Sequence, residues 1–240
     1  MTGFLQIETV SKAFGGLKAV DDVTFAVEPG ELISIIGPNG AGKTTLFNLL
    51  TGQLAPTGGR VLFEGRDISR LAPSQRARLG LGRTFQISKT LTSMSVLENA
   101  MIGAFLHHRT LADAADKAAK ALDMVGLGAR ARDRSASLTL GERRRLEVAR
   151  ALAMEPRIVL LDEVMAGLNQ TEVQEIIDLV QKLNAGGLTF LVIEHNLKVV
   201  RAFSDRVIVL NRGAILAQGT AGDVLGNPAV IEAYLGKRRQ

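Results

Sequence analysis

At 240 residues, with 46% hydrophobic residues, the chain is long and apolar enough to bury a substantial core, which excludes a disordered protein. The absence of cysteine excludes disulfides and thiolate metal sites. No apolar run approaches the roughly 18–20 residues that a membrane-spanning helix needs, and the N-terminus lacks a signal-peptide pattern. We therefore expect a soluble, cytoplasmic protein.

The formal net charge is +5, and basic residues cluster at 143–145 and at 237–239. Only 4% of the residues are aromatic, so the stacking side chains of a nucleic-acid surface are missing, and we predict no nucleic-acid partner. A solvated helix face and a charged terminus are the simplest interpretation of the two clusters. Attraction to an anionic membrane surface or to an acidic partner loop is the alternative.

Three strands are predicted before the first glycine-rich segment. They are short apolar or alternating runs at residues 4–10, 19–27 and 31–36. Gly15 and Gly16 mark a turn between the first two strands. The third run, LISII, is wholly apolar, as expected of a central strand. A helix from Lys43 to Leu50 and an edge or hairpin strand at 61–65 follow.

The pattern becomes helical between about residues 92 and 153. Residues 111–127 predict an alanine-rich helix that ends near Gly126 and Gly128. Its apolar face is expected from the positions at helical spacing, which are Leu111, Ala115, Ala118, Leu122 and Val125. Another helix is expected to begin near residue 140.

Strands return in the last third of the chain. They are predicted at residues 157–163, 188–195 and 206–210. A helix at 171–184 separates the first two and has one apolar face, formed by Val173, Ile176, Ile177, Val180 and Leu183. A hairpin turns near Arg212 and Gly213, and a short helix at 228–235 follows. This alternation predicts an α/β fold with a mostly parallel sheet, interrupted by the helical block.

Residues 37–45 (GPNGAGKTT) fit the phosphate-loop pattern G-x-x-x-x-G-K-[ST]. Glycines let backbone N–H groups converge on phosphate oxygens, and the following helix N-terminus adds its dipole. Lys43 can reach the β- and γ-phosphates, and Thr44 can offer its hydroxyl to Mg²⁺. The strand before and the helix after the loop favour this interpretation over a plain glycine turn. The predicted nucleotide-binding residues here are Gly37, Pro38, Asn39, Gly40, Ala41, Gly42, Lys43, Thr44 and Thr45.

Asp162 and Glu163 follow four apolar residues at the end of a predicted buried strand. A carboxylate in this position can hold Mg²⁺, usually through water. A second carboxylate beside it can polarise an attacking water as a general base. The alternative is that two acids simply cap a strand, and the phosphate loop upstream argues against it.

Residues 138–142 (LTLGE) start a helix and precede RRRLEVARAL and the acidic strand. Together with the phosphate loop, this order resembles the ATP-binding-cassette (ABC) family, and the resemblance covers nearly the whole chain. The common form of the motif is L-S-x-G-[QE]; Thr139 departs from it but keeps a hydroxyl that can bond a γ-phosphate. The resemblance implies that Thr139, Gly141 and Glu142 engage the ATP held by another protomer, so that hydrolysis requires a head-to-tail dimer.

The resemblance also implies roles for three isolated polar residues. Glu163 matches the catalytic base, and Gln86 in GRTFQ matches the Q-loop glutamine, which ligates Mg²⁺ or orients water. His195, 32 positions after Glu163, matches the H-loop histidine that contacts the γ-phosphate. By itself this histidine would more often be a core or edge residue. The implied metal ligands are Thr44, Gln86 and Asp162.

Two further segments match the family at its nucleotide and dimer contacts. Phe14 matches the aromatic residue that stacks on adenine; a buried apolar residue is the alternative. Residues 166–169 (AGLN) match the D-loop at the dimer interface, with Asn169 in place of the more frequent aspartate. Val164 departs from the usual proline after the catalytic glutamate, which implies a less rigid loop behind Glu163.

The resemblance implies a single ABC ATP-binding domain over residues 1–240. Its P-loop NTPase core, with a mostly parallel sheet and an N-terminal antiparallel β part, is expected at 1–87 and 154–240. Its α-helical subdomain is expected at 88–153.

Local features look like the importer branch for branched-chain amino acids, and within it the larger of two ATPase subunits. These features include SKAFGGLKAVDDVTF, GRTFQ, IEHNLKVV and the closing PAVIEAYLG. The resemblance implies a membrane permease that contacts residues 87–100, a second ATPase subunit or a second copy of this chain, and indirectly a solute-binding protein. The expected location is the cytoplasmic face of the inner membrane, as a peripheral subunit.

Alternative functions stay open at this point. Uptake of amides or urea uses similar ATPases, and the ATPase of a lipopolysaccharide-type exporter shares much of the sequence style. A soluble ABC protein that acts on ribosomes or DNA would carry two cassettes or long coiled-coil arms, and this chain has neither. A GTPase is disfavoured because the N-K-x-D motif that reads guanine is missing.

Overall fold

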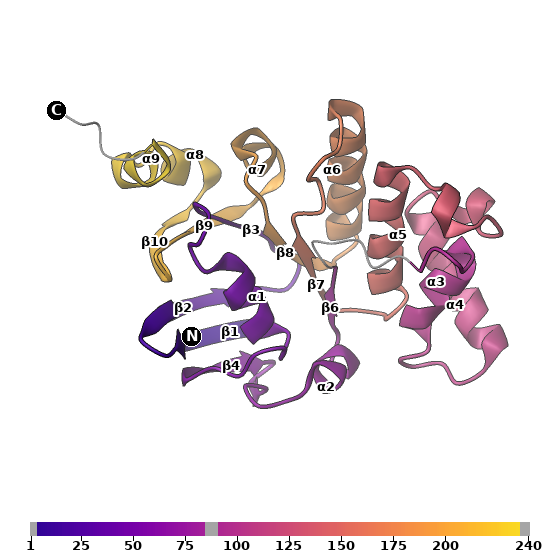
Figure 1. The fold of residues 1–240 in the computed structure, drawn as a ribbon, viewed down its shortest axis with the longest axis horizontal. Helices are drawn as coiled ribbons and strands as arrows, with labels where there is room; N and C mark the ends of the chain where they lie inside the picture. Colours follow the sequence, from indigo (N-terminus) through magenta and orange to yellow (C-terminus); the bar gives the residue numbers. More distant parts are fainter. Residues whose placement is uncertain (1–3, 85–90, 236–240) are drawn as a thin grey trace. The chain divides into compact units, whose positions relative to one another are not determined.

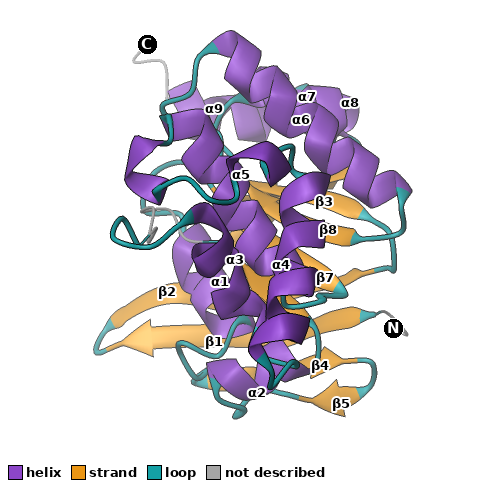
Figure 2. Ribbon diagram, turned by 90° about the vertical axis from the view of Figure 1, so that its right-hand side faces the viewer, coloured by secondary structure: helices purple, strands orange, loops and turns teal. Residues whose placement is uncertain are grey.

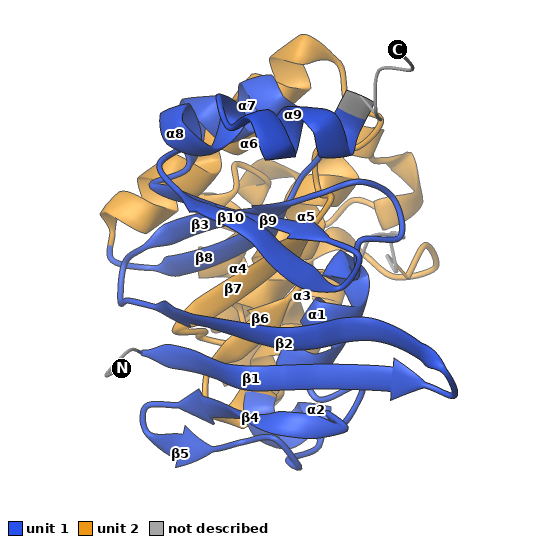
Figure 3. Ribbon diagram, turned by 90° about the vertical axis from the view of Figure 1, so that its left-hand side faces the viewer, with its two compact units in different colours: residues 1–76, 187–240 blue, residues 77–186 orange. Residues whose placement is uncertain are grey.

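The computed structural model describes residues 4–84 and 91–235 of the chain. These residues form two compact units (Figure 3). Unit 1 comprises Met1–Arg76 and Gly187–Gln240, and unit 2 comprises Ala77–Gly186. Each unit has its own strands and helices, so the two are described in turn.

Unit 1 contains an antiparallel sheet in the order β2-β1-β4-β5 (Figure 2). Its strands are β1 (Leu5–Phe14), β2 (Leu17–Val27), β4 (Gly58–Phe63) and β5 (Arg66–Asp67). β1 and β2 form a hairpin that runs from the Leu5–Val27 pair to the Phe14–Leu17 pair, with irregular register in between. The predicted N-terminal antiparallel part is therefore confirmed, although β1 extends four residues beyond the expected strand.

The second sheet of unit 1 contains a buried parallel strand between two parallel neighbours. β3 (Leu32–Ile36) pairs with β8 (Thr189–Ile193) on one side and with β9 (Arg206–Asn211) on the other. β10 (Ala214–Gly219) returns antiparallel along β9, as the hairpin pattern predicts. Every residue of β3 and β8 is buried, which is typical of parallel strands covered on both faces.

Helices complete unit 1. α1 (Lys43–Leu50) has the predicted bounds, and α2 (Pro73–Arg78) follows β5. Three short helices near the C-terminal end, α7 (Leu197–Phe203), α8 (Ala221–Leu225) and α9 (Pro228–Leu235), lie beside the β9–β10 hairpin (Figure 1). They pack through Val200, Val224 and Val230 against Ile36, Val207 and Val209.

Unit 2 contains a short parallel strand pair and four long helices. β6 (Leu81–Arg83) pairs with β7 (Ile158–Asp162). The helices are α3 (Val96–Ala104), α4 (Leu111–Met124), α5 (Leu140–Leu152) and α6 (Gln170–Ala185), with 3₁₀ turns at Gly128–Arg130 and Ser135–Ser137. α3, α4 and α5 pack together (Figure 1). Within residues 4–84 and 91–235, no helix combines the length and apolar character needed to cross a membrane.

Two expectations about helix surfaces are wrong. Leu111 is 71% exposed, and the buried face of α4 includes Ala114 in place of Ala115. Alanine fits a buried or an exposed face of a helix, so the spacing of alanines alone does not fix which face of α4 is buried. The packing of α4 against α3 and α5 decides it. In α5, Arg144 is buried and paired with Glu147, so residues 143–145 are not simply a solvated basic face.

A buried arginine closes the C-terminal end of α1. Arg76 in α2 is almost completely buried, and its guanidinium donates to the carbonyl oxygens of Leu49, Leu50, Ser69 and Leu71. Burial lowers its pKa to about 10. The last carbonyls of a helix lack the usual partners within the helix, so Arg76 supplies side-chain donors to the end of α1 and to the loop before α2.

Replacing Arg76 with methionine should lower the free energy of unfolding by about 3 kcal/mol, because four carbonyl acceptors lose a buried guanidinium donor. Urea unfolding followed by circular dichroism measures this. Arg78→Met is the matched control, since Arg78 lies exposed on the same helix, and it should change stability by less than about 0.5 kcal/mol. Equal effects of the two substitutions would contradict the capping role.

Candidate functional site

The glycine-rich segment of unit 1 joins the end of β3 to the start of α1. Gly37 and Gly42 have φ of +151° and +101°. A Cβ on Gly37 would lie 2.1 Å from the carbonyl oxygen of Leu210, and one on Gly42 would lie 2.3 Å from that of Ala19. Neighbouring backbone therefore leaves no room for a side chain, and the loop keeps its shape only with glycine at these two positions.

The first turn of α1 exposes backbone donors in the way that a phosphate site needs. Gly42 caps the helix without a side-chain hydrogen bond, and the first turn contains no acidic residue. Thr44 is exposed and Thr45 is half-buried. Unbonded N–H groups at a helix start attract anions, so this turn and the loop before it suit phosphate oxygens.

Lys43 is buried and folds back over its own loop. Its Nζ donates to the carbonyl oxygen of Gly37 at 2.7 Å and to that of Pro38 at 3.1 Å. Asn39 and Gly40 are exposed, whereas Ala41 is buried and accepts from the backbone N–H of Gly213. The ammonium group is therefore already at the loop that the sequence predicts to hold phosphates.

Gly42→Ala should destabilise the nucleotide-free protein by at least about 2 kcal/mol more than Gly40→Ala. Both positions have positive φ, so both substitutions strain the backbone. Only the Cβ at residue 42 meets a backbone oxygen, whereas the one at residue 40 meets nothing within 4 Å. Thermal unfolding of the two variants measures the difference, and equal midpoints would disprove the steric argument.

His195 lies at the same edge of the parallel sheet as the phosphate loop. Ile35 of β3 is in register with Ile193 of β8, and the chains continue from there to Gly37 and to His195. His195 is exposed and follows the strand by two residues, so it is not the last residue of the strand as expected. The exposed side chain therefore lies at the edge of the sheet where the phosphate loop begins.

Phe14 is the last residue of β1 and is 49% exposed. The alternative that it is a buried apolar residue is therefore wrong. The ammonium of Lys12 lies 5.2 Å from the centre of its ring and also donates to the carbonyl oxygen of Ala55. An exposed ring held by a cation–π contact remains compatible with stacking on a nucleotide base.

The acidic strand end of unit 2 contains a buried ion pair. Asp162 ends β7 and is 1% exposed, and its Oδ2 accepts from Nη2 of Arg83 at 2.7 Å. The backbone N–H of Asp162 donates to Oγ1 of Thr84. Sequence analysis missed Arg83. The pairing of β6 with β7 brings Arg83 to the carboxylate, and this pairing cannot be read from the sequence. In the sequence, Arg83 is marked only by its place shortly before Gln86.

Glu163 adopts an unusual backbone conformation immediately after β7. Its φ is +52°, in the left-handed region that residues with side chains rarely enter, and its side chain is half-buried. Such conformations cluster at functional sites, where surrounding structure maintains them. Val164, which stands where the family usually has proline, is buried.

The LTLGE segment forms the capped start of α5. Oγ1 of Thr139 accepts from the N–H of Glu142, and Oε2 of Glu142 accepts from the N–H of Thr139. Gly141 is buried, and a Cβ there would lie 2.8 Å from Oε1 of Glu172, at the start of α6. The glycine therefore allows close packing of these two helix starts. The Thr139 hydroxyl still has its own hydrogen to donate.

The segment between β7 and α6 lies beside the start of α5. Asn169 caps α6 in the same reciprocal way with Glu172, and a Cβ on Gly167 would contact the side chain of Leu140 at 3.4 Å. Unit 2 therefore brings the predicted D-loop beside residues 138–142. Gln86 lies outside the described residues.

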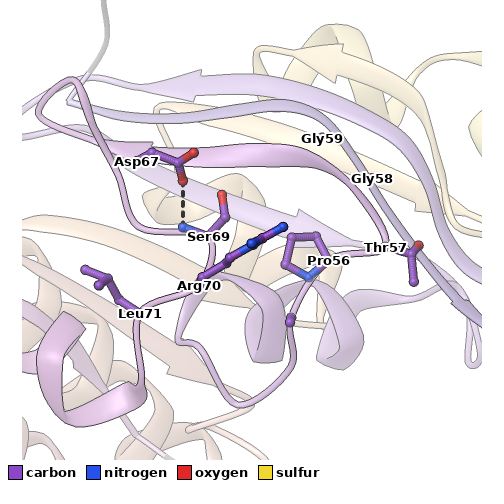
Figure 4. Close-up of a pocket in the computed structure, with 9 residues that line it drawn as sticks. Pro56, Thr57, Gly58, Gly59, Asp67, Ser69, Arg70 and Leu71 are labelled. Carbon is purple, nitrogen blue, oxygen red and sulfur yellow. Dashed lines mark hydrogen bonds between the residues drawn. The ribbon is translucent and has the colours of Figure 1, made fainter.

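A pocket of about 540 Å³ in unit 1 does not contain any of these residues (Figure 4). It is lined by residues 55–59 and by Asp67, Ser69, Arg70 and Leu71. Hydrogen bonding to the side chain of Ser69, together with the Ser69 N–H that donates to Oδ1 of Asp67, lowers the pKa of this carboxyl group. Within the described part of the chain there is also no cluster of three histidine, cysteine or acidic residues that could hold a metal ion.

A glycine-rich loop between a buried parallel strand and a helix start defines the P-loop class of nucleotide-binding proteins. Comparisons with known proteins refine this class. The ABC transporter family matches residues 20–166, and the family described as branched-chain amino acid ATP-binding cassette transporters matches residues 214–239. The chain belongs to the ABC transporter family, and it is an ATP-binding subunit of the kind that hydrolyses ATP.

The relatives are similar along their whole length. The chain is 41% identical to the high-affinity branched-chain amino acid transport ATP-binding protein LivG of Escherichia coli, covering 97% of this chain and 98% of LivG. It is 40% identical to BraF of Pseudomonas aeruginosa over the same shares. The fold matches a nucleotide-free ATP-binding cassette with a TM-score of 0.90 and 35% identity, over 98% of this chain and 99% of that one.

A dimeric bacterial ABC transporter cassette also matches, with a TM-score of 0.81 and 27% identity, over 90% of this chain and 98% of that one. Together these findings confirm the ABC ATPase fold and the family that the sequence motifs indicate.

Proposed function

We propose that this chain is the ATP-hydrolysing subunit of an importer that takes up branched-chain amino acids or related small solutes through a separate permease. The observation that carries the proposal is the full-length similarity to transport ATP-binding proteins named for these solutes. The separate match of residues 214–239 to a branched-chain amino acid transporter family supports it.

The unit 1 residues would bind the nucleotide. The Gly37–Thr45 backbone surrounds the β- and γ-phosphates, and Lys43 exchanges its two carbonyl acceptors for phosphate oxygens. The exposed Thr44 hydroxyl would offer an oxygen ligand to Mg²⁺, and Phe14 would stack on adenine. His195 contacts the γ-phosphate from the same sheet edge.

The unit 2 residues would provide the hydrolytic chemistry and the contact with a second protomer. Asp162 supplies a buried carboxylate for Mg²⁺ with Gln86, and Glu163 polarises the attacking water as general base. Mg²⁺ itself would neutralise charge on the phosphates. Thr139, Gly141 and Glu142 face the γ-phosphate of ATP bound by the other protomer of a head-to-tail dimer, which is either a second copy or a related subunit.

The helical part of unit 2 would contact the permease. Leu91, Ile102 and Phe105, in and around α3, are exposed apolar residues, as expected of a protein-binding surface. The subunit would lie peripherally at the cytoplasmic face of the inner membrane, where residues 87–100 contact the permease. A solute-binding protein would act on the other side and take part only indirectly.

Glu163→Gln should reduce ATP hydrolysis by about 100-fold or more while ATP binding is retained, because the amide cannot accept the proton of water. ATP should then accumulate a stable dimer, which size-exclusion chromatography with light scattering detects. Lys43→Ala is the control, since it removes the charge that faces the phosphates and should form no ATP-dependent dimer. Normal turnover by Glu163→Gln would exclude this residue as the base.

Uptake of labelled leucine by cells tests the transport role. Deletion of the gene should abolish high-affinity uptake, and the wild-type chain, but not Glu163→Gln, should restore it. Unchanged uptake, together with copurification of export proteins or of ribosomal proteins, would leave the ATPase chemistry intact and overturn the importer assignment.

A further inference from the structure

The start of α5 has an electrostatic conflict with the anion that it would bind. Glu142 lies three residues after the Thr139 cap, in the first turn, and its side chain is only 16% exposed. A helix N-terminus attracts anions, but a nearby carboxylate repels a γ-phosphate through a weakly hydrated medium. Binding therefore requires that the charge of Glu142 be compensated.

Arg130 provides this compensation. It is the last residue of the 3₁₀ turn Gly128–Arg130, and its Nη1 donates to Oε1 of Glu142 at 2.5 Å. Its Nε donates to Asp133, and its Nη2 donates to Oγ of Ser137. Burial opposes the charged form of Glu142, but the N–H of Thr139 and Arg130 outweigh it and lower the pKa of this carboxyl group.

Other charged groups near the turn already have partners of their own. Oε2 of Glu172 accepts from the N–H of Asn169, and Nη2 of Arg143 donates to the carbonyl oxygen of Ala136. Arg145 lies 3.8 Å from Glu175. Within residues 4–84 and 91–235, Arg130 is thus the cation that forms an ion pair with Glu142.

We propose that Arg130 is a positioning residue that neutralises Glu142 and thereby allows the residue 138–142 turn to accept the γ-phosphate of ATP bound by the other protomer. This inference rests on the proposed function, which assigns that contact to the turn. Arg130 acts through Glu142 and does not itself touch the nucleotide.

ATP-driven dimerisation of Glu163→Gln protein tests the inference, measured by analytical ultracentrifugation at several ionic strengths. Arg130→Met should weaken the dimer by about tenfold at low ionic strength and by less at high ionic strength, because salt screens part of the repulsion between Glu142 and the phosphate. Adding Glu142→Gln should restore the dimer, since the amide oxygen still accepts from Thr139 but has no charge. Nucleotide affinity of the monomer should not change.

Asp133→Asn tests whether Arg130 acts by neutralising Glu142 or by holding the segment around residues 130–133 in place. It removes the other ion pair of Arg130 and keeps the pair with Glu142, so it should leave the dimer within about twofold of the parent. If Arg130→Met has no effect, or if Glu142→Gln fails to restore the dimer while thermal unfolding shows a folded protein, the inference is wrong. If the parent Glu163→Gln protein forms no dimer with ATP, the head-to-tail dimer of two copies of this chain fails instead.

Discussion

The architecture of unit 1 depends on the close approach of backbone segments at the phosphate loop. The carbonyl oxygens of Leu210 in β9 and Ala19 in β2 occupy the space that side chains at Gly37 and Gly42 would need. Backbone atoms of both sheets of the unit therefore pack against the phosphate loop. The loop follows β3, which lies between its two parallel neighbours β8 and β9. A loop fixed from several sides is pre-organised, so less conformational entropy is lost when phosphates bind.

The functional turns of unit 2 use a different device, the reciprocal capping box. It recurs at the starts of α3, α5 and α6, through Ser95 with Glu98, Thr139 with Glu142 and Asn169 with Glu172. Each box satisfies two backbone donors and fixes how the chain enters the helix. At α5 and α6 the capped turns are also the segments proposed to contact the other protomer, so the hydrogen bonds that stabilise each helix start would also fix the shape of that surface.

Local sequence signals predicted the features that depend on local geometry. The bounds of α1 were predictable because the glycine-rich loop and the helix start coincide in sequence at Lys43. The face of α4 and the end of β1 were not, since packing partners decide them. Arg76 and Arg83 could not be found from the sequence, because charged residues are usually exposed and each is buried only through strands or helices brought together by the fold. The roles assigned to the site residues remain predictions.

Three cations at the candidate site are paired with acceptors within their own unit. Lys43 is bonded to two carbonyl oxygens of its own loop, Arg83 to Asp162, and Arg130 to Glu142. A buried charge without a partner is costly, so these contacts stabilise the charged groups and hold them in place. If the proposed function holds, Lys43 would exchange its neutral acceptors for phosphate oxygens, which are stronger acceptors, whereas Arg130 would keep its carboxylate while the phosphate approaches. In the proposed function, unit 1 would therefore bind its phosphate by releasing a cation to it, whereas the turn of unit 2 would accept a phosphate because a negative charge near it is cancelled.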